Sequence, residues 1–433
     1  KGTICKLHIY WKLHKPIKKH QINSRPIVSN ICKGIPYFTS HVSNFVHQQL
    51  KDLVNKQPTI LTNYSELILN LEKLKRKKSD NLFIVTADVV ALYPSIPLGN
   101  GLTALNWFLD THTNFDKKQK EFLLDCTRFV LTNNFVSSDE YKSDKVFIQI
   151  KGTAMGTILS VIYANIYMIW IEYQIVIQFA QFILLYKRLL DDILIIWCGP
   201  PLELARFKIA MINKGKDETQ YKTKKESNNI AFTWNDNIVD VNTSVPFTYL
   251  NLSIKIENDE KRIYIEPYAK PVRAYSYLPF HSMHPPAVFK GWIKAELFRY
   301  LSACSTLDIW ERETALFFER LSARGYPANF LAQIFNTVCF EDRESRLQHK
   351  PDKIAKLRKF QENRGIFLTL TYNPSALKEL PKRTLQRFKN ISSLQHIQHE
   401  IPDRLQIIFR SSSNLDAIIK HNPNAHTTLA PTP

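Results

Sequence analysis

Cysteine is scarce in this chain, and no two cysteines lie close together. The sequence holds six cysteines in 433 residues, scattered from Cys5 to Cys339. A disulfide framework needs clustered cysteines, and a zinc knuckle needs two of them a few residues apart. Neither is indicated here, and the pattern favours a reducing compartment.

Acidic residues are absent from the amino-terminal stretch. No aspartate or glutamate precedes Asp52, whereas nine lysines and arginines do. Over the whole chain, 58 basic residues face 39 acidic ones, a formal net charge of +19. Such a balance favours a polyanionic partner, and the amino-terminal block is typical of a phosphate-facing surface. The alternative is a solvated basic face.

Charge is also missing from residues 152–171, a stretch long enough to cross a bilayer. The stretch contains glycine, threonine, serine and asparagine, and segments rich in candidate site residues flank it, so we predict a buried helix and no membrane partner. The chain opens on Lys1 without a signal peptide, which leaves open whether further residues precede it.

Two adjacent acids, Asp191 and Asp192, stand between apolar runs within residues 186–197. This pattern predicts a β-hairpin with two carboxylates at its turn. A third acid, Asp88, ends another apolar strand. Because adjacent like charges resist burial without a cation, three acids on two strand ends predict a site for two magnesium ions and a nucleotide-transfer reaction. The simpler explanation of the doublet is a solvated turn, where aspartate is common.

Strand and helix patterns mix along the first two thirds of the chain. We predict strands at 81–93, 186–197, 230–234, 247–256 and 262–266, and helices at 67–78, 98–132 and 202–214. Beyond Pro267 the sequence becomes rich in Arg, Lys and aromatic residues, and we predict helices at 288–336 and 354–391. The fold class is therefore α+β with an antiparallel sheet, followed by a helical domain.

Several short motifs follow one another in a recognisable order. They are Lys12-Leu-His-Lys-Pro16, Arg25-Pro-Ile-Val-Ser29, Asp88 with Leu92-Tyr93, Gln149 with Gly152-Thr-Ala-Met-Gly156, the Asp191-Asp192 hairpin, Tyr249-Leu-Asn-Leu252 and Arg324-Gly-Tyr-Pro327. Together they resemble the reverse transcriptase of Penelope-like retroelements over nearly the whole chain. The resemblance implies a right-hand polymerase, related to telomerase reverse transcriptase, with fingers at 1–80, a palm at 81–268 that includes finger helices at about 98–146, and a helical thumb and tail at 269–433.

The resemblance also implies a role for each matching residue. Asp88, Asp191 and Asp192 would be the catalytic metal ligands, with the backbone carbonyl of Val89 added. The incoming nucleotide would contact Arg25, Lys15, Lys12, Tyr93, Gln149 and Gly152. Gly156 and Leu189 would lie against template and primer, where glycine allows close backbone approach. The ring of Tyr93 would exclude a 2′-hydroxyl, so the product would be DNA; its alternative is an ordinary packed tyrosine.

Several features depart from that family, among them Asn251 in place of the usual aspartate and Thr157 in place of the common serine. Leu189 stands where an aromatic residue is usual, two positions before the acid doublet, which points to weaker primer support or to decay. The GIY-YIG endonuclease that many members carry after the thumb is absent from the sequence. Either a truncated polymerase or the endonuclease-lacking type that extends chromosome ends fits this, and the sequence does not choose.

The expected function is RNA-directed DNA synthesis with an RNA template, a DNA primer and dNTPs, using two Mg²⁺ ions or alternatively Mn²⁺. The resemblance places this activity in the nucleus, at chromosomal DNA, after a cytoplasmic stage. Two rival functions remain open: an RNA-dependent RNA polymerase with the same palm, and a non-catalytic RNA-binding protein derived from a reverse transcriptase. The oligomeric state is unknown from the sequence.

Overall fold

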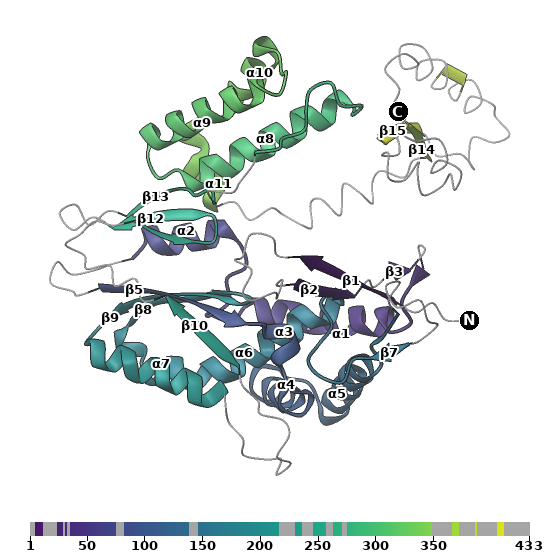
Figure 1. Ribbon diagram of the computed structural model, residues 1–433, viewed down its shortest axis with the longest axis vertical. Coiled ribbons are helices and arrows are strands. Elements are labelled where there is room, and N and C mark those ends of the chain that lie inside the picture. Colours follow the sequence, from purple (N-terminus) through teal and green to yellow (C-terminus); the bar gives the residue numbers. More distant parts are fainter. Residues whose placement is uncertain are drawn as a thin grey trace, which may run out of the picture. The chain divides into compact units, whose positions relative to one another are not determined.

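The computed structural model divides the chain into two compact units, Lys1–Val272 and Arg273–Pro433 (Figure 1). It describes residues 5–11, 24–28, 31–32, 35–74, 82–137, 146–215, 230–235, 246–256, 263–270, 275–348, 366–371, 386–387 and 405–410. Mixed helices and antiparallel sheets confirm the α+β class. The assignment of ranges to fingers, palm and thumb stays a prediction.

A four-stranded antiparallel sheet of order β10-β5-β9-β8 forms the centre of the first unit. The strands are β5 (Leu82–Val90), β8 (Ile183–Leu189), β9 (Asp192–Cys198) and β10 (Ala231–Asn235). Residues 193–197 of β9 are all buried, because this inner strand is covered on both faces. Strands β8 and β9 form the predicted hairpin, with the acid doublet at its turn.

Helices pack beneath this sheet in Figure 1 and share one apolar core with it. They are α1 (Ser40–Asn55), α3 (Leu92–Ser95), α4 (Leu98–His112), α5 (Lys117–Thr132), α6 (Ile158–Gln178) and α7 (Pro201–Gly215). Among the described helices, α6 alone is long and apolar enough to cross a membrane, and 67% of its most apolar window is buried inside the protein. The prediction of a buried helix here is confirmed.

A second sheet, of order β2-β1-β6-β7, takes two of its strands from the amino-terminal stretch. Its strands are β1 (Cys5–Trp11), β2 (Ser24–Val28), β6 (Phe135–Ser137) and β7 (Phe147–Ile148), and the small hairpin β3 (Ile31–Cys32) and β4 (Ile35–Pro36) follows β2 along the chain. Tyr37 ties this sheet to the end of α5, since its hydroxyl donates to the Asn133 carbonyl at 2.7 Å and accepts from the Phe135 N–H at 3.0 Å.

Three further strands form an antiparallel sheet of order β11-β12-β13. They are β11 (Phe247–Tyr249), β12 (Leu252–Ile256) and β13 (Ile263–Pro267), and helix α2 (Tyr64–Glu72) contacts β13. The helix predicted at 67–78 begins at Tyr64 and ends at Glu72, while residues 75–81 lie outside the described part.

The second unit contains the helices predicted at 288–336. They are α8 (Pro286–Ala303), α9 (Leu307–Ser322) and α10 (Ala328–Phe335), followed by the short η3 (Phe340–Asp342) and α11 (Arg343–Gln348). The prediction of a helix at 354–391 is wrong for residues 366–371. There the chain forms the strand β14 (Ile366–Thr371), which pairs in parallel with β15 (Leu405–Arg410). The Ile-Phe-Leu-Thr-Leu-Thr segment is rich in strand-forming residues, which favours this outcome.

Candidate functional site

The acid doublet lies in a tight two-residue turn between β8 and β9. Leu189 pairs with Asp192, which leaves Leu190 and Asp191 as the turn residues. Leu190 has a φ of 62°, a left-handed conformation that a leucine seldom adopts. Such strain costs about 1–3 kcal/mol and persists where the surroundings over-determine the conformation, as at functional sites.

The third acid meets the doublet across the sheet. Asp88 of β5 stands directly opposite Asp192 of β9, so the two side chains leave the same face of the sheet. One residue on, the Val89 N–H donates to the Asp191 carbonyl at 3.0 Å. Two chain segments about a hundred residues apart therefore bring three aspartates to one end of the sheet, as the sequence predicted.

Burial and the two neighbouring acids raise the proton affinity of Asp192. Burial, and then the charges of Asp191 and Asp88, raise the pKa of Asp192 to about 6, while Lys270 opposes the rise. A hard divalent cation would relieve this repulsion, and carboxylate oxygens are the ligands that Mg²⁺ prefers. Among the described residues, no group of three or more His, Cys, Asp and Glu side chains is arranged to hold a metal ion. The donor set thus fits magnesium in its chemistry, and the backbones of Asp88 and Asp192 are paired, but the three carboxylates do not surround a common point.

Tyr93 lies beside this group of acids. It belongs to the short helix α3, which starts just after Ala91, a residue with a φ of 49°. Burial, and then the charge of Asp191, raise the pKa of Tyr93 to about 12, so the phenol stays protonated at neutral pH. The charge of Asp191 thus acts on the Tyr93 phenol, and the contact of Tyr93 with the sugar of a nucleotide stays a prediction.

The glycine motif forms a loop that joins Tyr93 to the amino-terminal sheet. The Thr153 N–H donates to the Tyr93 carbonyl at 2.9 Å, and the Met155 carbonyl accepts from the Val28 N–H of β2 at 2.7 Å. A Cβ on Gly152 would lie 2.5 Å from the Tyr93 oxygen, and one on Gly156 would lie 2.1 Å from the Val28 oxygen. The glycines thus allow protein backbone to approach protein backbone, and their contact with the template stays a prediction.

Buried hydroxyl groups hold this loop on the first turn of α6. The Ser160 hydroxyl donates to the Ala154 carbonyl at 2.6 Å and lies 2.7 Å from the Thr153 hydroxyl. Thr157 also forms a hydrogen bond with Ser160. These contacts fix the loop between Gly152 and Gly156 without any charged group.

The predicted nucleotide-binding residues lie in different surroundings, and two of them are not described by the structure. Arg25 is exposed on β2, three residues before Val28. Gln149 donates from Nε2 to the Lys151 carbonyl at 2.9 Å, and it lines a cavity of about 240 Å³ with Pro26, Pro94 and Thr153. Lys12 and Lys15 lie outside the described residues. Leu189 is partly buried at the end of β8, and its role toward the primer stays a prediction.

A buried ion pair lies behind the doublet, and the sequence patterns did not predict it. Arg188 of β8 and Glu172 of α6 have no exposed side-chain surface, and they meet at 2.5 Å between Nε and Oε1. Tyr249 of β11 belongs to one of the quoted motifs, but its contact with the doublet was not predicted: its hydroxyl donates to the Asp192 carbonyl at 2.9 Å. One signal was available for Glu172: it is the single charge within the apolar residues 158–178, and such a charge is seldom buried unpaired.

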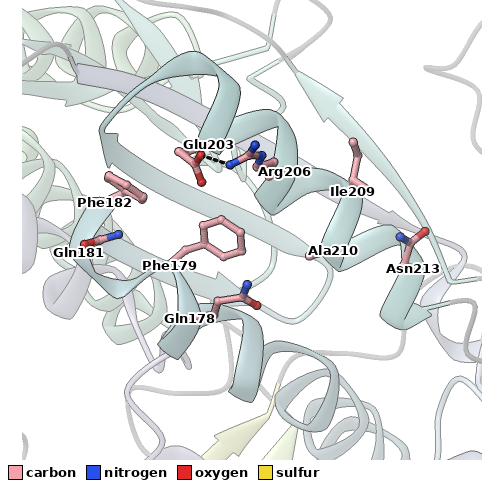
Figure 2. A pocket seen from close by; sticks show the side chains of 9 residues that line it. All are labelled: Gln178, Phe179, Gln181, Phe182, Glu203, Arg206, Ile209, Ala210 and Asn213. Carbon is pink, nitrogen blue, oxygen red and sulfur yellow. Dashed lines mark hydrogen bonds and ion pairs between the residues drawn. The ribbon is translucent and has the colours of Figure 1, made fainter.

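A second cavity, of about 480 Å³, lies away from the acids. Figure 2 shows it between the end of α6, the short helix η1 (Ala180–Phe182) and α7, with Phe179 and the ion pair of Arg206 and Glu203 in its wall. It adjoins the open end of the β8–β9 hairpin, opposite the turn. The length of the two strands therefore lies between this cavity and the candidate site.

Comparison with known proteins gives one family match and several structural likenesses. Residues 276–336 match the family model of the animal helix-turn-helix domain. No curated protein matches the chain. Telomerase from Candida albicans, solved with a fragment of telomeric RNA, is similar at 12% identity and a TM-score of 0.47, covering 83% of this chain and 58% of that one.

Two other solved structures are similar at comparable levels. An apo telomerase from Candida tropicalis, truncated from its C-terminal domain, has 13% identity and a TM-score of 0.40 over 60% of this chain. The RNA-dependent RNA polymerase of BmCPV in its quiescent state has 11% identity and a TM-score of 0.39 over 69% of this chain. The chain spans 55% to 58% of the length of those two telomerase chains and 25% of the viral polymerase.

Proposed function

We propose that this chain is an RNA-directed DNA polymerase of a Penelope-like retroelement. The observation that carries the proposal is the pairing of Asp88 with Asp192, fastened by the hydrogen bond from Val89 to Asp191. This places three carboxylates at one end of an antiparallel sheet. A solvated turn would explain the doublet alone, but it would not explain the third acid opposite it.

Asp88, Asp191 and Asp192 would hold divalent metal ions, Mg²⁺ or alternatively Mn²⁺, with the Val89 carbonyl as a further oxygen donor. When bound, such ions stabilise charge on the attacking and leaving oxygens of a phosphoryl transfer. The remaining work falls to other residues. Arg25 binds the triphosphate, because a guanidinium matches phosphate oxygens in a two-point contact. Its strand, β2, is joined to Tyr93 through Val28 and the glycine loop.

Tyr93 would select the sugar. Burial and the charge of Asp191 keep its phenol protonated at neutral pH, and we expect its ring to present bulk where a 2′-hydroxyl would enter. The substrates would therefore be dNTPs, the template RNA and the primer DNA, with the nucleus as the place of action. The net charge of +19 supports a nucleic-acid partner.

Primer extension on an RNA template tests this function. The purified chain, given Mg²⁺, should extend a DNA primer with dNTPs and much less with NTPs, and Asp191→Ala should abolish extension while retaining template binding. Tyr93→Ala should raise the use of NTPs relative to dNTPs. Preferential NTP use by the wild-type chain would identify an RNA polymerase instead. Salt-dependent RNA binding with no extension in Mg²⁺ or Mn²⁺ would identify a non-catalytic RNA-binding protein.

A further inference from the structure

Arg188 is an arginine whose every N–H group is used inside the protein. The Nε atom donates to Glu172 Oε1 at 2.5 Å, and Nη2 donates to Glu172 Oε2 at 3.3 Å and to the Asn165 carbonyl at 3.4 Å. The Nη1 atom donates to Asn165 Oδ1 at 2.8 Å and to the Leu190 carbonyl at 2.9 Å. A guanidinium has five N–H donors, and all five find acceptors here.

This network has a cost in folding free energy. Arg188 and Glu172 are fully buried, and a buried ion pair carries a desolvation penalty that well-packed apolar side chains avoid. Tyr186 completes the network by donating from its hydroxyl to Glu172 Oε1 at 2.8 Å. Stability alone does not require such a pair. Its role is therefore indicated by the backbone segment to which Arg188 donates.

That group is the strained turn of the acid doublet. Three successive carbonyls there each accept a hydrogen bond from a different element: Leu190 from the Arg188 side chain, Asp191 from the Val89 N–H and Asp192 from the Tyr249 hydroxyl. The Leu190 carbonyl belongs to the peptide bond that enters Asp191. Arg188 and Val89 therefore fix the peptide planes on both sides of Asp191, and with them the direction of its Cα–Cβ bond.

The backbone of Arg188 is anchored as well. Its N–H donates to the Thr59 carbonyl at 2.8 Å, and its carbonyl accepts from the Leu61 N–H at 2.9 Å. The guanidinium thus reaches the turn from a strand residue that is itself held on both sides.

We propose that Arg188 is a positioning residue that, held by Glu172 and Asn165, fixes the Leu190 carbonyl and so sets the divalent-cation affinity of Asp191. The inference rests on the proposed metal-binding role of the doublet. Partners that orient a metal ligand from behind change affinity by roughly 10- to 100-fold when removed. A loss of that size is expected when the clamp on Leu190 is removed.

The test separates positioning from stability by removing the ion pair as a pair. In Arg188→Met/Glu172→Gln the unpaired buried charge is avoided, and the glutamine oxygen still accepts from Tyr186. We expect this variant to unfold near the wild-type temperature, because an apolar replacement of a buried ion pair is often neutral or better. Arg206→Met/Glu203→Gln makes the same two changes at a more exposed ion pair on α7, away from the turn, and serves as the control for the substitutions themselves.

Two measurements are made on each full-length chain: Mn²⁺ binding by electron paramagnetic resonance, and hydrogen exchange of the peptide that spans residues 189–193. The proposal expects the Arg188→Met/Glu172→Gln chain to bind Mn²⁺ roughly 10- to 100-fold more weakly and to exchange faster at the turn, with the control unchanged. Wild-type affinity and exchange in a stable double variant would overturn it.

Arg188→Lys decides the matter if the double variant does not fold, since a single ammonium cannot contact Glu172, Asn165 and Leu190 in the same geometry. The same weakening and faster exchange are expected, and unchanged values would overturn the proposal. If Asp191→Asn leaves wild-type Mn²⁺ binding unaltered, the metal role of the doublet, and with it the proposed function, is contradicted. The exchange measurement still decides whether Arg188 holds the turn.

Discussion

At the scale of single residues, the site combines unfavourable features that support one another. Leu190 adopts a left-handed conformation, Asp192 is partly buried beside two like charges, and Arg188 is wholly buried. Each of these costs stability when taken alone. They occur at one turn of one hairpin, which indicates that the turn is maintained for its chemistry.

The first prediction concerns pH and Asp192. Its pKa is about 6 in the folded chain, against an ordinary value of 3.8 that applies when the chain is unfolded, so the folded state binds the proton more tightly. The proton on Asp192 therefore contributes to the free energy of unfolding. This contribution is complete below about pH 4 and is lost as pH rises through about 6. Near pH 4, Asp192→Asn should therefore have the same unfolding temperature as the wild-type chain. Above pH 6 its unfolding temperature should be higher than that of the wild-type chain. Thermal melts in EDTA measure both.

Asp52→Asn, at an exposed position of α1, is the control for this melt series. It should follow the wild-type curve at every pH. If Asp192→Asn shows the same pH dependence as the wild-type chain, the repulsion among the three acids does not exist in the folded protein.

The acids could be predicted from the sequence because their signal is local. Each ends or interrupts an apolar run, and charge in such a place is conspicuous. Arg188 and Glu172 could not be paired in this way, since they belong to a strand and a helix that meet only in the folded chain. Tyr249 is further removed, and its hydrogen bond to Asp192 depends on a hairpin that packs beside the turn.

At the scale of elements, the positions of the central strands could be predicted from the sequence. Which strands pair with one another was harder to predict. The apolar runs of β5, β8 and β9 mark them as strands, and the two-residue turn makes the β8–β9 pairing local. The register that sets Asp88 against Asp192 is long-range and follows from which faces of the strands are buried. Strand β14 was missed because its parallel partner, β15, lies more than thirty residues further on.

The glycine loop gives the second prediction. Gly156 has a φ of +123°, and an added Cβ would lie 2.1 Å from the Val28 oxygen, a backbone atom that cannot move alone. Gly156→Ala should therefore push β2 away, destabilise the chain by about 2 kcal/mol or more, and weaken nucleotide binding through Arg25. Chemical denaturation and a nucleotide titration measure the two effects.

Two other glycines separate the causes of this effect. Gly325 has a φ of +84° with nothing within 4 Å of an added Cβ, so Gly325→Ala isolates the backbone strain. Gly291 lies within α8 and is also unobstructed, so Gly291→Ala should stabilise by about 0.5–1 kcal/mol. If Gly156→Ala costs no more than Gly325→Ala, the close approach to Val28 is not what requires the glycine.

At the scale of the whole molecule, charge and hydrophobic content explain different properties. The core of the first unit gathers around α6, whose apolar sequence is accounted for by burial. The excess of 19 positive charges has no such structural use, because surface charges of one sign repel one another. A polyanionic partner gives that excess a role.

The third prediction follows from this excess. RNA binding should weaken linearly with salt on a double logarithmic plot, by roughly 10³-fold or more between 50 and 200 mM if six or more phosphates are neutralised. Asp191→Asn should bind as well as the wild-type chain when measured by fluorescence anisotropy at several salt concentrations. An affinity that does not depend on salt would contradict a phosphate-facing surface.

The proposed polymerase requires that Asp88 and the Asp191–Asp192 doublet form a single divalent-cation site. Iron-directed cleavage tests this directly: Fe²⁺ bound in place of Mg²⁺ generates radicals that cut nearby backbone when ascorbate and peroxide are added. We predict cuts near residue 88 and near residues 191–192 together, both suppressed by excess Mg²⁺ and by Asp191→Asn. Cleavage at one of the two segments without the other, or cuts at both that survive Asp191→Asn, would contradict the shared site.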